Sequence, residues 1–190
     1  MIRVPPVPEP DGFDEARSKG NRWLESNRAG SPPSLWSAFR DDLEHGFRSR
    51  CGYAAMYTPG GQVDHYRCQR DYRALIYEWT NYRYVSGTIN SRKKALDVLD
   101  PYEVDPSWFE ILHPSLQLVL TSAVPDEERA RAERTIIKLG LRDGEFVLKM
   151  RRQWLQMYLE SKVNLAGLRD LAPLLADMIE RHEVSPDPRS

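Results

Sequence analysis

The chain has 190 residues, enough for one ordinary domain, and its apolar share of 41% is normal for a soluble globule. No run of about 18 uncharged apolar residues offers a membrane span, and the opening MIRVPPVPEPDG lacks the apolar segment of a signal peptide, so we expect a cytoplasmic protein without a membrane partner. The net charge of -1 excludes a global attraction to nucleic acid, and two cysteines are too few for a disulfide scaffold or a four-ligand zinc site.

The N-terminal quarter combines a proline-rich segment with two predicted helices. Four prolines in the first ten residues lack backbone donors and favour extended geometry, which predicts an arm rather than a packed element. Apolar residues at helical spacing predict helices over 14–26 and 34–48, and we expect Ser34 to cap the second one.

The next segment changes to a strand-like period. CGYAAMY, TPGG and QVDHYRC predict two short strands, 51–57 and 62–68, around a four-residue turn. If Tyr57 pairs with Gln62, Cys51 lies opposite Cys68. This register predicts a buried pair of thiols.

The remainder predicts a helix, a second hairpin and further helices. The first helix runs from Asn90 to about Leu99 and ends before a proline. SWFEIL and LQLVLT, separated by a proline-containing turn, predict the hairpin. Helical patterns then cover 126–139, 145–160 and 168–182, and we interpret the aromatic stripe of the second as core.

The net charge of the whole chain is close to zero, but one segment is basic. Between His65 and Lys94 the sequence has seven Lys or Arg residues and two acidic ones. Such a patch can hold phosphates of nucleic acid. The candidates are Arg67, Arg83, Arg92, Lys93 and Lys94. Tyr66 and Tyr72 are open to the same role, or to that of a solvated loop.

Four polar residues of the same region could form a catalytic site. If the strand pair packs against the following helix, Asp64 and Asn90 face each other with oxygen donors, which suit Mg²⁺ or Mn²⁺. A neutral His65 beside them could take a proton from water during phosphodiester hydrolysis. Asn81 would hold the imidazole or the phosphate by hydrogen bonds.

The order Asp-His, Asn, Asn resembles the HNH endonuclease (ββα-metal) superfamily. Trp79 lies two residues before the middle Asn and Lys93 three after the last, and the N-to-N variant is similar to the HNH domain of RNA-guided CRISPR nucleases. The resemblance implies that Asp64 and Asn90 bind the metal, that His65 is the general base and that Asn81 orients it.

The flanks resemble HNH proteins that also hold a structural zinc. CGYAAMY and SGTIN stand where those proteins have four cysteines, but Ala54, Ser86 and Ile89 occupy three of the positions. We therefore expect no structural zinc. Packing has to replace it, by Tyr53, Met56, Val85 and Ile89.

The layout beyond the motif is similar to HNH proteins encoded beside an ATPase in anti-phage systems of the Septu and retron-associated type. That resemblance implies a defence effector with DNA as substrate and an ATPase partner docked on the C-terminal helices. The expected fold is α+β in one compact unit: arm and helices over 1–50, a ββα nuclease core over 51–100, and a second hairpin with helices over 101–190.

Two other interpretations remain open. The chain could be a catalytically silent HNH-fold module that binds nucleic acid or serves as a structural subunit. It could also be a helical adaptor in which the motif is accidental. Convergence of Asp64, His65 and Asn90 in the structure would exclude the adaptor.

Overall fold

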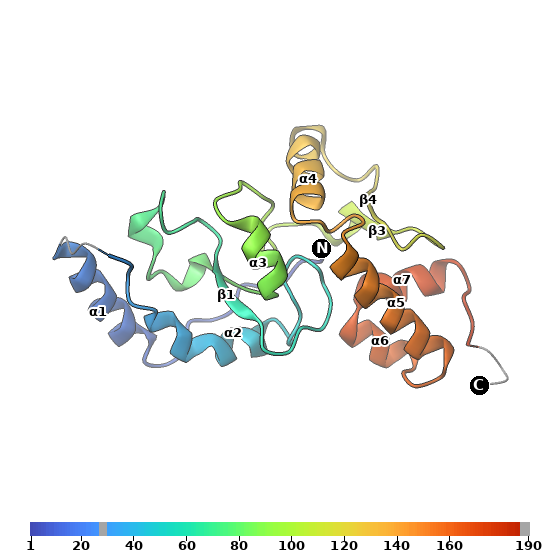
Figure 1. Cartoon of the computed structure of the whole chain (residues 1–190), viewed down its shortest axis with the longest axis horizontal. Coiled ribbons are helices and arrows are strands. Elements are labelled where there is room, and N and C mark those ends of the chain that lie inside the picture. The colour runs from blue at the N-terminus through green and yellow to red at the C-terminus, as the bar shows by residue number, and fades with distance from the viewer. Residues whose placement is uncertain (27–29, 187–190) are drawn as a thin grey trace.

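The computed structural model describes residues 1–26 and 30–186, and within them the chain folds as a mixed α+β protein. Seven α-helices in this part accompany two separate antiparallel sheets of two strands each. The molecule is elongated, with the N-terminal helices at one end, the C-terminal helices at the other, and strand β1 with helix α3 between them (Figure 1). The predicted α+β class is confirmed.

The N-terminal helices agree with the sequence pattern in position but not in every detail. Helix α1 (Phe13–Glu25) matches the first predicted helix. The second is divided into a 3-10 turn (Leu35–Phe39) and α2 (Arg40–Gly46), which ends two residues early. Ser34 stands at the N-cap position of this turn, as predicted, although its side chain makes no capping hydrogen bond.

The proline-rich segment has no helix or strand, yet it is packed. Met1 and Val4 are buried, and the Val4 amide donates to the carbonyl of Pro101 at 2.9 Å. The Trp79 indole donates to the carbonyl of Val7 at 2.8 Å. The expectation of an unpacked arm is therefore wrong, since these bonds attach the segment to the domain.

The central unit is two strands followed by a helix. Strand β1 (Gln62–His65) pairs antiparallel with β2 (Tyr82–Val85), and two 3-10 turns (Arg73–Leu75 and Trp79–Asn81) lie between them. Helix α3 (Gly87–Lys93) follows at once, capped by the Ser86 hydroxyl. The predicted helix over 90–99 thus begins earlier and ends earlier.

The predicted hairpin of 51–57 with 62–68 is wrong. Cys51 and Met56 instead close a turn, in which the Cys51 amide donates to the Met56 carbonyl at 3.0 Å. Cys51 is buried, whereas Cys68 is half-buried and its thiol donates to Asp71 at 3.2 Å. The two cysteines are therefore not a buried pair.

The C-terminal part confirms the second hairpin, with β3 (Phe109–Ile111) antiparallel to β4 (Leu118–Leu120) after a 3-10 turn (Pro106–Trp108). Helices α4 (Asp126–Lys138) and α5 (Glu145–Leu159) lie where predicted. The last predicted helix is split into α6 (Leu165–Leu171) and α7 (Pro173–Arg181), because proline lacks the amide that would continue the first.

Buried side chains form two clusters. One contains Phe13, Trp36, Tyr82 and other aromatic residues from the N-terminal helices and β2. The other joins the turn at Cys51 to α3 and the C-terminal helices. The aromatic stripe of α5 packs against this second cluster, which confirms its interpretation as core.

Candidate functional site

Strand β1 and helix α3 meet along a polar seam. Gln62 and Asp64 share one face of β1, because side chains two apart in a strand point the same way. Asn90 and Lys93 share one face of α3, because they are three apart in a helix. The Asn90 amide donates to Gln62 Oε1 at 3.0 Å, and the Lys93 ammonium lies 3.1 Å from Asp64 Oδ1. The seam therefore has two neighbouring polar pairs.

The second pair is sealed from solvent. Lys93 is 0% exposed and Asp64 is 4% exposed. The ammonium also donates to the carbonyls of His65 and Tyr66, at 2.9 Å each, so each of its three hydrogens has an acceptor. Burial raises the pKa of Asp64, and the positive charge of Lys93 opposes that rise. The carboxylate is thus neutralised by a buried cation of the same chain.

His65 faces away from this seam, because it follows Asp64 directly in the strand. Its ring packs edge-on against Trp36 and Tyr82, with ring centres 4.5 and 5.0 Å away. Its Nε2 lies 2.9 Å from the Ile76 carbonyl, which can only accept, so Nε2 carries the hydrogen. Nδ1 then accepts from the Gln69 amide at 3.1 Å. Burial lowers the pKa of His65 to about 4, and the imidazole is neutral at neutral pH.

Asn81 fastens the loop that follows His65. Its Oδ1 accepts from the Arg67 amide at 2.7 Å, and its Nδ2 donates to the carbonyls of Arg67 and Leu75, at 3.0 Å each. The prediction that Asn81 holds the imidazole is corrected, because these bonds engage both ends of its amide with backbone. It positions the residues after His65 instead.

The five predicted phosphate-binding residues separate into two groups. Arg83 forms a buried ion pair with Asp100, with Nε 2.6 Å from Oδ1, and Lys93 is buried as described. Both leave the set of surface candidates, because their charges are neutralised inside the protein. Lys94 and Arg92 are exposed, and Arg67 is half-buried.

The four positions where zinc-holding HNH proteins have cysteines, Cys51, Ala54, Ser86 and Ile89, lie in the core. The amide of Ala54 donates to the Cys51 thiol at 3.5 Å, and the amide of Ile89 donates to the Ser86 hydroxyl at 3.3 Å. Hydrogen bonds from Ser86 also lower the pKa of Cys51, although burial raises it more. The four residues expected to pack in place of a zinc, Tyr53, Met56, Val85 and Ile89, are all buried in one cluster.

The donors of the seam suit a hard cation in their chemistry. Asp64 offers a carboxylate and Asn90 an amide oxygen, and the Lys93 ammonium already acts as a cation held only by oxygen atoms. A metal ion at Asp64 would have to displace this ammonium. Residues 1–26 and 30–186 contain no group of three or more His, Cys, Asp or Glu side chains that could hold a metal.

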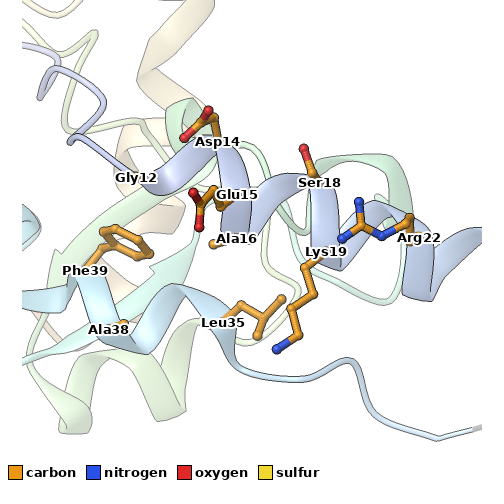
Figure 2. A pocket seen from close by; sticks show the side chains of 10 residues that line it. All are labelled: Gly12, Asp14, Glu15, Ala16, Ser18, Lys19, Arg22, Leu35, Ala38 and Phe39. Atoms are coloured by element: carbon orange, nitrogen blue, oxygen red, sulfur yellow. The ribbon is translucent and has the colours of Figure 1, made fainter.

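Of two hollows on the surface, one lies beside the candidate site and the other lies away from it. One of about 390 Å³ is lined by Tyr66, Arg67, Asn81 and Tyr102, next to the loop after β1. Another, of about 610 Å³, lies between α1 and the 3-10 turn at Leu35, with exposed Asp14 and Lys19 on its rim (Figure 2). This second hollow contains none of the predicted site residues.

No family model matches the chain, and no curated protein does either. In the described part, no helix is long and apolar enough to cross a membrane.

As residues of the site, sequence reasoning missed Gln62, which contacts Asn90, and Tyr53, which contacts Asp64. Gln62 could have been found, because it stands two residues before Asp64 and so shares its face of the strand.

Proposed function

We propose that the chain is a metal-dependent endonuclease of the HNH, or ββα-metal, type, which hydrolyses phosphodiester bonds in DNA. The observation that carries the proposal is the seam between β1 and α3. Asp64 and Asn90 are 26 positions apart, yet both face the same interface of a strand-strand-helix unit, beside a buried cation. A core held by apolar packing alone needs no such set of oxygen donors.

In this proposal Asp64 and Asn90 would hold the ion, in the place that the Lys93 ammonium takes in the structure. A bound Mg²⁺ or Mn²⁺ would neutralise the negative charge that develops on the phosphate. Lys93 then carries a free ammonium next to the loop after His65, where it can pair with a phosphate oxygen of the substrate.

His65 is the proton acceptor in the proposed reaction, which requires its ring to turn towards the seam, because in the structure it packs on the opposite face of β1. Its neutral imidazole holds a hydrogen on Nε2, bonded to the Ile76 carbonyl, which leaves the Nδ1 lone pair to take a proton from water. The Gln69 amide covers that lone pair and has to swing aside. Asn81 keeps the loop in register during this movement, through its bonds to Arg67 and Leu75.

The proposal includes an anti-phage role with an ATPase partner, which rests on the resemblance of the sequence layout. The C-terminal helices offer exposed apolar side chains for docking, Ile137 on α4 and Met157 on α5. Co-purification with the product of a neighbouring ATPase gene tests this part. An Ile137→Glu variant that co-purifies equally well would contradict docking through α4.

Plasmid cleavage in Mg²⁺ or Mn²⁺ tests the nuclease. The wild-type chain, alone and with its partner, should cut in either ion and not in EDTA. His65→Ala and Asn90→Ala should both abolish cutting, whereas His45→Ala, an exposed histidine of α2, should leave it intact. Cutting that survives His65→Ala rules out this site.

A silent nucleic-acid-binding module is the second candidate, and one observation favours it. Lys93 has three oxygen acceptors and no exposed surface, and both nitrogens of His65 are engaged. Calorimetry with Mg²⁺ and Mn²⁺ separates the candidates. Heat that disappears in Asn90→Ala supports the nuclease, and no heat with the wild type supports the silent module.

A further inference from the structure

Three arginines from distant parts of the chain converge on one exposed carboxylate. Arg67 of the loop after β1 and Arg131 and Arg134 of α4 lie 3.5, 3.4 and 4.0 Å from Asp97. The Asp97 side chain is 56% exposed. We define these three arginines with Asp97 as the arginine cluster.

Two of the three arginines are also held in place by contacts other than the carboxylate. The Arg67 guanidinium lies over the rings of Tyr66 and Tyr72, 4.9 and 5.5 Å from their centres. Arg131 donates to the Tyr66 hydroxyl at 2.7 Å and to the Val98 carbonyl at 2.9 Å. Arg67 and Arg131 are therefore arranged in advance for an anion and do not depend on Asp97 for their positions.

Asp97 satisfies these guanidinium groups poorly. Of its three contacts, only that with Arg67 has the geometry of a hydrogen bond, and the contact with Arg134 is 4.0 Å long. Within the described residues, Glu128 is the other carboxylate at ion-pair distance, 3.6 Å from Arg131, and Glu103 lines hollows beside Arg67 and Arg131. At ion-pair distance three guanidinium groups thus meet two carboxylates, and the exposed position of Asp97 leaves the cluster able to take a further anion.

We propose that the arginine cluster binds a phosphate of a nucleic-acid backbone and that Asp97 occupies the phosphate position in the free protein. Planar guanidinium groups suit phosphate oxygens, which they bind in pairs. The cluster adjoins the candidate site, because the backbone amide of Arg67 is bonded to Asn81. This inference rests on the proposed function for its substrate, and it adds α4 to the surface that holds it.

Fluorescence anisotropy with a labelled DNA oligonucleotide, in EDTA, tests the cluster without cleavage. Arg131→Glu/Arg134→Glu should weaken binding at least tenfold. The dependence of binding on salt should become shallower by about 1 in log-log slope, because one phosphate contact is lost. Lys149→Glu/Arg152→Glu is the matched control, since it reverses two exposed charges at the same spacing on α5. It should change binding less than twofold.

Asp97→Asn provides the sharper test. Removal of the internal competitor should tighten binding severalfold and steepen the salt dependence, whereas a merely structural role for Asp97 predicts no gain. Arg134→Glu alone keeps the bonds of Arg131, so it reports on the cluster even if the double variant misfolds.

Two results overturn the inference. They are unchanged binding in both arginine variants and weaker binding in Asp97→Asn. These results do not decide whether the protein is a nuclease, which is tested separately. Binding through the cluster without any cutting in Mg²⁺ or Mn²⁺ refutes the nuclease alone, and cutting with unaltered binding in the arginine variants refutes the cluster alone.

Discussion

The buried ion pair of Asp64 and Lys93 gives the most direct test of the structure. Two unit charges 3.1 Å apart attract by about 5 kcal/mol at an effective dielectric constant of about 20. Asp64→Asn removes one charge and keeps the shape of the side chain. Loss of one partner of a buried pair costs about 3–5 kcal/mol, because the other charge stays out of water. We expect a loss of about 3 kcal/mol in the free energy of unfolding, since Lys93 retains two carbonyl acceptors.

The opposite variant, Lys93→Met, has a different dependence on pH. A carboxyl group can take up a proton when its counter-charge is removed. Burial already raises the pKa of Asp64, and loss of the ammonium raises it further. A folded-state pKa above the unfolded value of about 3.9 adds stability at low pH that is lost as pH rises through it. The deficit of Lys93→Met relative to wild type should therefore shrink as pH falls from 7 towards 4.

Urea denaturation of the wild type and both variants, at several pH values, measures these differences. The slopes with urea should agree, so that midpoints report stability. Asn90→Ala serves as the control, because it removes a half-buried neutral pair of the same seam and should cost about 1 kcal/mol or less. A loss below about 1 kcal/mol in Asp64→Asn, or a pH-independent deficit in Lys93→Met, would refute the buried pair.

Three further variants test the surroundings of the site. Burial lowers the pKa of His65 to about 4, so the neutral imidazole contributes its full stability to the folded state above the unfolded pKa of about 6.5. The free energy of unfolding should then fall by about 3 kcal/mol as pH drops towards 4. His65→Gln should remove this pH dependence, as measured by urea denaturation at several pH values. Asn81→Ala should cost about 2–3 kcal/mol and speed amide exchange over 67–75, and unchanged protection there would contradict the loop contacts. Gly20→Ala places a Cβ 2.4 Å from the Tyr77 ring, so the free energy of unfolding should fall by about 1–3 kcal/mol in thermal unfolding. Helix propensity alone predicts that it rises by about 1 kcal/mol. A rise would show that the Tyr77 ring can move.

Elements that are set by local pattern could be predicted from the sequence. Helices α1, α4 and α5 have regular apolar spacing, and the hairpin of β3 and β4 has a short turn between two apolar runs. In each case the residues that decide the structure lie within a few positions of one another. The order of Asp64, Asn81 and Asn90 also indicated that the strand of Asp64 and the helix of Asn90, β1 and α3, would meet. They meet because α3 directly follows β2, the strand that pairs with β1.

Pairings between distant residues could not be predicted in the same way. The turn residues before β1 favoured a local hairpin, but β1 instead pairs with β2, across a loop of 16 residues, 66–81. The sequence alone does not reveal that Cys51 and Met56 close their own turn, which removes the local partner strand. Charge was misleading for Arg83, because a basic residue in a basic segment suggests a surface unless its buried acidic partner, Asp100, is known.

The buried ion pairs change where nucleic acid can be held. Arg83 and Lys93 are neutralised by Asp100 and Asp64, so the apparent positive excess between His65 and Lys94 is partly internal. The charge that remains on the surface is supplemented by α4, whose arginines reach the same loop through Asp97. A phosphate track confined to the strand-strand-helix unit would therefore be weak. On the proposal that the protein binds DNA, we therefore expect α4 to contribute to that binding through Arg131 and Arg134.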